Sequence, residues 1–262
     1  MTDERYIKLD DVSLNYPVYG GQKLKTGSKY AEDATSGMGN LVIKGNTPKF
    51  VKALQNISLD LRPGDRLALI GRNGSGKTTL LRVMAGIYQP TSGKVSVSGR
   101  ISTLFAMGMG MRPQSSGYRN IVLLGLFAGY PRSKIEEIVE DVKEFTELGN
   151  FLNLPVNSYS QGMAMRLKFA VATAIEPDIL IMDEWIGAGD EKFRQKAADR
   201  MNAVFHGSGI AVLASHNNKL LQRTCNKAIW LESGKIQAAG DVDEVIELMN
   251  AEKKKAIRAE LT

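Results

Sequence analysis

Residues 71–79 constrain the fold of this chain more than any other part of its sequence, and they read Gly-Arg-Asn-Gly-Ser-Gly-Lys-Thr-Thr. This segment matches the pattern G-x-x-x-x-G-K-[ST] at each fixed position. The aliphatic residues 67–70 before it are typical of a strand, and the mostly apolar residues 80–84 after it are typical of a helix. A strand, a glycine-rich loop and a helix in this order predict a phosphate-binding loop in an α/β fold.

The residue types in this loop suit a chain of phosphate groups. The glycines let the backbone curl so that several N–H groups point at one phosphate chain, and the following helix adds its positive N-terminal end. Lys77 can reach the β- and γ-phosphates, and the hydroxyl of Thr78 can hold Mg²⁺. The residues that we expect to bind the nucleotide here are Gly71, Asn73, Gly74, Ser75, Gly76, Lys77, Thr78 and Thr79.

Asp183 and Glu184 directly follow the apolar residues 179–182. The C-terminal end of a buried strand in an open α/β sheet faces the ligand crevice. Asp183 at that place suits the shell of a Mg²⁺ ion, and Glu184 could accept a proton from an attacking water. We therefore predict Thr78 and Asp183 as Mg²⁺ ligands and Glu184 as the catalytic base.

His216 follows a second apolar run, residues 210–214. A histidine at the end of a strand can hydrogen-bond the γ-phosphate and orient the attacking water. We therefore predict that His216 acts in catalysis together with Glu184 and Lys77.

Ser160 and Gly162 stand at the start of a helix that we expect to run to about residue 175. Ser160 can cap this helix and Gly162 permits close approach of a backbone, so the helix start could bind an anion. An ordinary helix cap explains the same residues, and taken alone it is the simpler interpretation.

Several strands are expected outside these motifs. Alternating apolar residues predict an edge strand over residues 6–16 and a closing hairpin over residues 229–238. Residues 94–98 and 101–105 flank Gly99 and predict a further hairpin.

A capping box formed by Ser133 and Glu136 predicts the start of a helix with one apolar face. The order of strands and helices predicts an α/β fold with a P-loop NTPase core, a mixed sheet, an antiparallel β part and an inserted α-helical subdomain. The expected organisation is a single domain over residues 1–262, a helical subdomain at about 108–172, a loop insertion at about 20–49 that has room for a short helical piece, and a helical tail over 241–262.

Composition excludes several kinds of site. Cys225 is the only cysteine, so no internal disulfide can form and we expect a reducing, cytoplasmic setting. With two histidines in the chain, we expect no zinc site. The charged first residues predict no signal peptide, and the longest apolar run, residues 121–130, is too short to cross a bilayer.

The formal net charge of +6 favours anionic partners such as a nucleotide, a nucleic acid or an anionic membrane face. A solvated surface with an excess of lysine explains the same charge equally well.

The order of the motifs is more specific than any one of them. A phosphate loop, a Ser-x-Gly helix start, an apolar strand ending in Asp-Glu and a strand ending in Ser-His follow one another in this chain. This order resembles the ATP-binding-cassette (ABC) ATPases over about residues 6–240.

The resemblance implies that the ligands are ATP and Mg²⁺. It implies that Tyr16 stacks on the adenine and that Asp190 lies in the short loop that this family has after its acidic strand. It also implies a head-to-tail homodimer, in which Ser160 and Gly162 contact the ATP of the other copy.

Two motifs depart from the family pattern. The usual Leu-Ser-Gly-Gly-Gln is Tyr-Ser-Gln-Gly-Met at residues 159–163, which keeps Ser160 and Gly162. Where the family has a glutamine near residue 105, this chain has Phe-Ala-Met at residues 105–107. Gln114 lies downstream, and whether it replaces the missing glutamine stays open.

The long stretch between Tyr16 and Ala53, and the glycines 108 and 110, resemble the ATPase subunits of exporters for lipid-linked polysaccharides such as O-antigen, capsule, galactan or teichoic acid. This implies a separate transmembrane permease dimer, a polysaccharide substrate reached through it, and a peripheral location on the cytoplasmic face of the inner membrane. Residues 121–130 would then either meet the permease or form ordinary helical core. Because the sequence stops at Thr262, we expect no carbohydrate-binding domain.

The expected mechanism is that two copies bind Mg-ATP and close, and that closure is transmitted to the permease before hydrolysis reopens the dimer. No nucleic acid is expected as a partner. Three alternatives stay open: an ABC ATPase of a different transporter, a soluble ABC ATPase that acts on nucleic acid or ribosomes, and a nucleotide-gated regulatory module with little hydrolysis.

Overall fold

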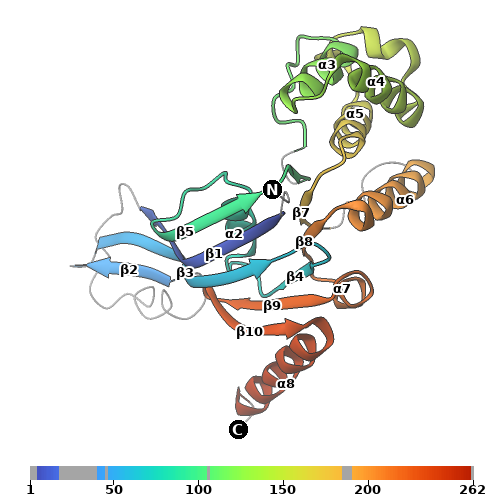
Figure 1. Ribbon diagram of the computed structural model, residues 1–262. Coiled ribbons are helices and arrows are strands. Elements are labelled where there is room, and N and C mark those ends of the chain that lie inside the picture. The colour runs from blue at the N-terminus through green and yellow to red at the C-terminus, as the bar shows by residue number, and fades with distance from the viewer. Residues whose placement is uncertain (1–4, 18–39, 45–46, 105–106, 185–190, 261–262) are drawn as a thin grey trace. The chain divides into compact units, whose positions relative to one another are not determined.

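The computed structural model describes residues 5–17, 40–44, 47–104, 107–184 and 191–260 of the 262-residue chain (Figure 1). The chain divides into two compact units. The first comprises Met1–Gly99, Ile181–Glu184 and Gly209–Thr262, and the second comprises Arg100–Leu180 and Trp185–Ser208.

A six-stranded sheet carries the strand that leads into the phosphate loop. Its order is β10-β9-β4-β8-β7-β6. Strand β4 runs parallel to β8 and β9, whereas β10 is antiparallel to β9. All five residues of β8 are buried, as expected for a parallel strand covered on both faces. The strands are β4 (Arg66–Ile70), β6 (Ile101–Thr103), β7 (Ile179–Asp183), β8 (Ile210–Ala214), β9 (Lys227–Glu232) and β10 (Lys235–Asp241).

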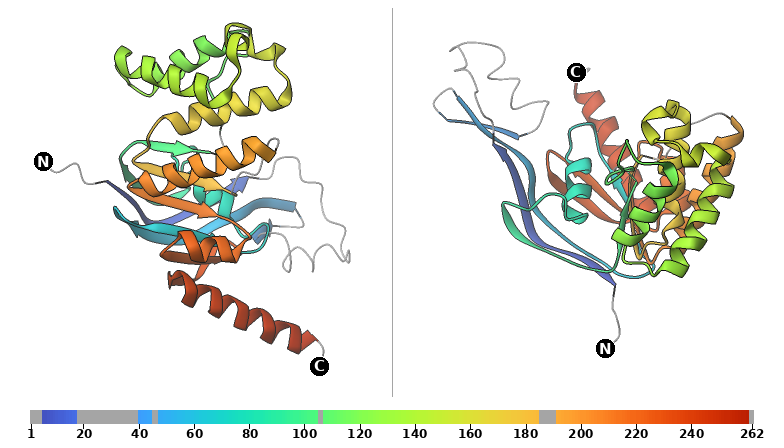
Figure 2. Two further views of the ribbon diagram at one scale, coloured as in Figure 1. Left: turned by 90° about the vertical axis from the view of Figure 1, so that its right-hand side faces the viewer. Right: turned by 90° about the horizontal axis from the view of Figure 1, so that it is seen from above.

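A second, antiparallel sheet has the order β2-β3-β1-β5. Its strands are β1 (Tyr6–Pro17), β2 (Asn40–Lys44), β3 (Thr47–Leu61) and β5 (Ser92–Ser98). Ile7, Leu9, Val12 and Leu14 of β1 are buried, and a register shift between Leu9 and Val12 interrupts the alternation that the sequence predicts. The prediction of an edge strand here is wrong, because β1 pairs with β3 on one side and with β5 on the other. Helix α2 (Lys77–Met84) contacts β3 and β5 of this sheet and β8 of the other, so it lies between the two sheets (Figure 2).

Two further expectations from sequence are wrong in this part of the fold. The loop expected over residues 20–49 includes β2 and the start of β3, because the aliphatic residues 41–43 pair with β3, with Leu41 opposite Val51. The hairpin expected around Gly99 does not form. Strand β5 pairs with β1 in one sheet and β6 joins the other sheet, so the chain changes sheets at Gly99.

The second unit is mainly helical. It contains α3 (Gly117–Phe127), α4 (Arg132–Thr146), the short 3₁₀ helices η1 (Gly149–Asn153) and η2 (Val156–Ser158), α5 (Gln161–Ala174) and α6 (Glu191–Gly207). Helices α3, α4 and α5 pack side by side, as the green and yellow ribbons of Figure 2 show. Ile135, Ile138, Val139, Val142 and Phe145 form the buried face of α4, as the sequence predicts.

The predicted capping box at the start of α4 is wrong. The helix begins at Arg132 with Pro131 as its N-cap, and it has no side-chain cap hydrogen bond. The carbonyl of Pro131 accepts from the amides of Lys134 and Ile135, so Ser133 already lies within the first turn. Pro131 is in the extended conformation and ends the preceding turn, which sets the helix start before Ser133.

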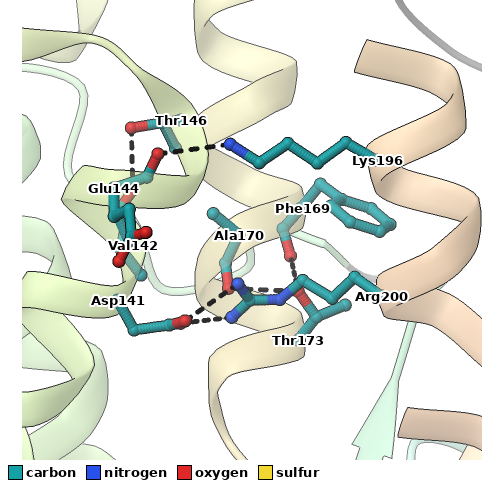
Figure 3. A network of polar contacts seen from close by, with 9 residues as sticks. All are labelled: Asp141, Val142, Glu144, Thr146, Phe169, Ala170, Thr173, Lys196 and Arg200. Atoms are coloured by element: carbon teal, nitrogen blue, oxygen red, sulfur yellow. Dashed lines mark hydrogen bonds and ion pairs between the residues drawn. The ribbon is translucent and has the colours of Figure 1, made fainter. Parts of the chain in front are cut away.

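Polar contacts join α4 to α6 (Figure 3), and ring contacts join both helices to α5. Arg200 of α6 donates to both carboxylate oxygens of Asp141 in α4. The guanidinium carbon of Arg200 also lies 4.4 Å from the ring centroid of Phe145, which stacks with Phe169 of α5 at 5.8 Å. Lys196, one turn earlier, donates to the carbonyl of Glu144 at 3.3 Å. These contacts fix α6 against the helices of its own unit.

The first unit has two further helices, α7 (Asn218–Thr224) before β9 and α8 (Val242–Glu260) after β10. Helix α8 packs on β9 and β10 through buried Val242, Val245, Ile246 and Met249. The closing hairpin and the helical end are therefore present as predicted. No helix among the described residues combines the length and the apolar character that crossing a membrane requires.

Candidate nucleotide-binding site

The backbone of the loop between β4 and α2 can be built only with glycine at two positions. Gly71 has φ 158°, and a Cβ there would lie 2.2 Å from the carbonyl oxygen of Leu231. Gly76 has φ 108°, and its Cβ would lie 2.8 Å from the carbonyl oxygen of Ala53. The loop is therefore held tightly between neighbouring strands, in a conformation that requires glycine.

Lys77 lies over this loop. Its Nζ donates to the carbonyl oxygens of Gly71 at 2.8 Å and Arg72 at 3.1 Å. Burial lowers the pKa of Lys77, while Asp183 and Glu184 act in the opposite direction. Lys77 Nζ is partly desolvated and is held by neutral carbonyl oxygens. An anionic acceptor would stabilise its positive charge further, so phosphate oxygens are the natural ligand for it.

Ser75 has a hydroxyl that finds no partner among the described residues. The residue is 4 % exposed, and within the described part of the chain its Oγ is a buried side-chain atom that forms no hydrogen bond. Its carbonyl oxygen is satisfied by the amide of Gly234 at 2.9 Å. An orphaned buried hydroxyl is costly unless a ligand pairs with it, and this fits a loop that takes phosphate.

The structure brings the two predicted Mg²⁺ ligands together. Thr78 Oγ1 donates to Asp183 Oδ2 at 2.6 Å, across a sequence separation of 105 residues. Among the described residues no group of three or more His, Cys, Asp or Glu side chains could hold a metal. A hydroxyl and one carboxylate fit Mg²⁺ that is shared with nucleotide phosphates, because this ion takes few protein ligands.

Glu184 occupies a strained place at the end of β7. Its φ is 68°, and its amide donates to the carbonyl oxygen of Ala214 at 2.8 Å. The hydroxyl of Ser215 donates to Glu184 Oε2 at 3.2 Å, and His216 Nε2 lies 3.8 Å from Oε1. Backbone strain of this kind concentrates at functional sites. Glu184 and His216, predicted from different strand ends, therefore meet.

One cleft of about 940 Å³ within the first unit is lined by Gly76, Lys77, Thr78, Asp183, Glu184 and His216. Tyr16 is part of its wall, and the Tyr16 hydroxyl donates to Thr79 Oγ1 at 3.4 Å. The cleft also contains residues that the sequence analysis missed: Val51, Lys52, Ala53, Ser233 and Gly234. Ser215 was missed too. Its position directly before His216 was the only signal, whereas the β3 and hairpin residues carried none because they reach the cleft through tertiary contacts.

The remaining predicted residues belong to the second unit. Ser160 is the N-cap of α5, and its hydroxyl accepts from the amide of Met163 at 3.3 Å. Among the residues that the structure describes, a Cβ at Gly162 would meet nothing closer than Ser160 Oγ at 4.0 Å, so packing against them does not demand glycine there. Gln114 is exposed. Asp190 lies outside the described residues, as do residues 105–106 of the missing glutamine motif.

Comparison with known proteins places these features in context. A family model described as "ABC transporter" matches residues 54–187. The O-antigen export system ATP-binding protein RfbE of Yersinia enterocolitica is 43% identical over 228 residues, which cover 86% of this chain and 94% of that protein. The teichoic acids export ATP-binding protein TagH of Bacillus cereus is 35% identical over 92% of this chain, which spans 41% of that longer protein.

A solved structure has the same fold. The dimeric structure of an ATP-binding cassette in a post-hydrolysis state, bound to ADP and Pi, superimposes with a TM-score of 0.64 at 19% identity. The match covers 90% of this chain and 98% of that one.

Proposed function

The chain belongs to the ABC transporter family, and from this premise we propose that it is the ATP-binding and ATP-hydrolysing subunit of an exporter for a lipid-linked polysaccharide. One observation carries the ATPase part: Lys77, the orphaned hydroxyl of Ser75 and the Thr78–Asp183 pair line or adjoin one cleft with Glu184. The relatives named for O-antigen and teichoic acid export support the choice of substrate.

The chemistry of the site follows from the charges of its own residues. The loop amides, Lys77 and the start of α2 hold the phosphates and neutralise the charge that develops on them. Mg²⁺, held by Thr78 and Asp183, would add further neutralisation. Glu184 accepts the proton of the attacking water, and Ser215 and His216 keep its carboxylate in place. Hydrolysis therefore needs both the loop and the end of β7.

A second copy of the chain is proposed to complete the site. Gly162 is open toward solvent and follows a capped helix start, so the phosphates of another copy could approach it closely. The cassette of similar fold is dimeric, which supports a head-to-tail homodimer. In this arrangement Ser160 and Gly162 bind the γ-phosphate held by the loop of the partner.

The energy of dimer closure is proposed to reach a separate transmembrane permease dimer. Leu126 and Phe127 at the end of α3 are 53% and 72% exposed, within the apolar segment 121–130. Exposed apolar side chains of this size mark a surface for a partner. We place the chain, through this partner, on the cytoplasmic face of the inner membrane.

The experiment that tests this function is capture of the membrane partner. Tagged Glu184→Gln protein with Mg-ATP is incubated with detergent-solubilised native membranes, and bound proteins are identified by mass spectrometry. Lys77→Ala serves as the control that cannot close on ATP. Recovery of a multi-spanning permease with the Glu184→Gln protein alone is expected. Recovery of ribosomal or nucleic-acid-binding proteins without an integral membrane protein would contradict the export role.

A further inference from the structure

Tyr88, which follows α2, touches the ring of Tyr16. The two ring centroids are 5.9 Å apart and the ring planes are at 82°, the perpendicular arrangement that aromatic pairs favour. Tyr16 lines the cleft, whereas Tyr88 is not among the described residues that line it. Tyr88 therefore contacts a residue of the site without being part of its lining.

Arg82 holds Tyr88 in three ways. Its Nη1 donates to the Tyr88 hydroxyl at 2.9 Å, and its guanidinium carbon lies 5.4 Å from the centroid of the Tyr88 ring. The carbonyl oxygen of Arg82 accepts from the amide of Tyr88 at 3.2 Å. Arg82 is in the last turn of α2, so the position of Tyr88 is fixed relative to the helix that starts at the phosphate loop.

The turn that carries Tyr88 is also tied to the strand that carries Tyr16. The amide of Thr91 donates to the carbonyl oxygen of Ser13 at 2.8 Å, and the amide of Asn15 donates to Thr91 Oγ1 at 2.9 Å. Together with the bond from the Tyr16 hydroxyl to Thr79, these contacts fix the plane of the Tyr16 ring. A phenol ring held in this way loses little rotamer freedom when a ligand stacks on it.

We propose that Tyr88 and Arg82 are positioning residues that preorganise the Tyr16 ring for stacking by the nucleobase of the bound nucleotide. This inference rests on the proposed function, because it requires a nucleoside triphosphate in the cleft. Every nucleobase presents a π-face, so Tyr88 and Arg82 should strengthen the binding of any base and should not select one base over another. The triphosphate itself is held by the loop and does not depend on these residues.

The test compares two ligands that differ in the base. Mg-ATP and Mg-tripolyphosphate are titrated calorimetrically into the full-length protein and into Tyr88→Ala. We expect the Kd of ATP to rise about 3- to 10-fold, the size of a lost aromatic pair, and the Kd of tripolyphosphate to stay within about 2-fold. Tyr88→Phe, which keeps the ring, should lie between the wild type and Tyr88→Ala. The KM for ATP should rise with kcat retained.

A matched control exists elsewhere in the chain. Arg100 Nη1 donates to the Tyr130 hydroxyl at 2.8 Å, and the Arg100 guanidinium carbon lies 5.2 Å from the Tyr130 ring centroid. Tyr130→Ala therefore removes the same kind of arginine–tyrosine pair in the second unit. It should change the affinity for neither ligand.

A double substitution tests whether Tyr88 acts through Tyr16. In a Tyr16→Ala background, Tyr88→Ala should weaken ATP binding by less than about 2-fold, because the ring that it positions is gone. Additive effects would overturn the inference, and so would an unchanged ATP affinity in Tyr88→Ala. An equal loss for both ligands would show that Tyr88 supports the loop instead.

The variants Lys77→Ala and Tyr16→Ala distinguish stacking of the base on Tyr16 from binding of the triphosphate by the loop. If Lys77→Ala loses both ligands while Tyr16→Ala loses neither, the base does not stack on Tyr16; the inference falls and the ATPase stands. If the wild-type protein binds neither ligand, both fall together.

Discussion

The strained backbone of Glu184 costs about 1–2 kcal/mol, since a side chain at φ 68° lies in the left-handed region. Its amide bond to Ala214 and the hydroxyl of Ser215 hold it there. The carboxylate lines the cleft beside His216, where we propose that it acts as the base for the attacking water.

Ser215 is expected to position Glu184. Ser215→Ala should lower kcat for ATP about 10-fold, the size of one hydrogen bond to a charged group, with little change in the Kd of ATP. Ser215→Thr keeps the hydroxyl and should restore most of the rate. Single-turnover kinetics and calorimetry measure the two quantities. Equal rates in the alanine and threonine variants would show that the hydroxyl has no part in the reaction.

Cys225 should be unreactive in the folded protein. Burial raises the pKa of its thiol from 9.0 to about 11, so at pH 8 the thiolate fraction falls about 100-fold below that of an ordinary cysteine. Iodoacetamide labelling followed by mass spectrometry should be slow in buffer and fast in denaturant. Because the raised pKa belongs to the folded state, its contribution to stability is present below pH 9 and is lost as the pH rises through 11. Rapid labelling of the native protein at pH 8 would contradict this environment.

The sequence predicted most of the chemistry of the site but not its supporting residues. The loop, Asp183, Glu184 and His216 stand in motifs whose spacing is visible along the chain. Lys52 and Ser233 come to the same cleft through strand pairing and a hairpin turn, and such long-range contacts leave no local pattern. The roles of all these residues stay predictions until they are tested.

At the scale of elements, periodicity identified the buried strands and the apolar face of α4, and it failed where pairing partners had to be chosen. The residues around Gly99 alternate as a hairpin would, yet β5 and β6 belong to different sheets. Two adjacent runs predict that strands exist, whereas the core on which each strand packs decides which strand it joins. The start of α4 was likewise set by Pro131 and not by the capping residues.

The network between α4 and α6 should contribute measurably to stability. Arg200→Ala removes the ion pair with Asp141 and the cation–π contact with Phe145, for an expected loss of about 1–2 kcal/mol. For a chain of this size, that corresponds to a fall in Tm of about 2–8 °C by calorimetry.

Lys143→Ala is the matched control for Arg200→Ala. It removes an exposed ion pair with Glu140 on α4, and its Tm should stay within about 2 °C of the wild type. If the Tm of both variants equalled that of the wild type, the network would have no stabilising role.

At the scale of the whole molecule, the order of motifs predicted the family and the fold, and the family model and relatives confirm both. The proposed homodimer, permease and exported polymer would depend on surfaces that meet other chains. A single sequence gives only weak signals for such surfaces. In segment 121–130, the apolar composition fits a docking surface and a helical core equally well.

We propose that the cleft hydrolyses ATP with Glu184 as the base, and the steady-state ATPase rate of Glu184→Gln, measured beside its affinity for Mg-ATP, tests this role. We predict that turnover falls at least about 100-fold, as for loss of a general base, while the Kd of ATP stays within about 3-fold of the wild type. Turnover at the wild-type rate in Glu184→Gln would contradict the account.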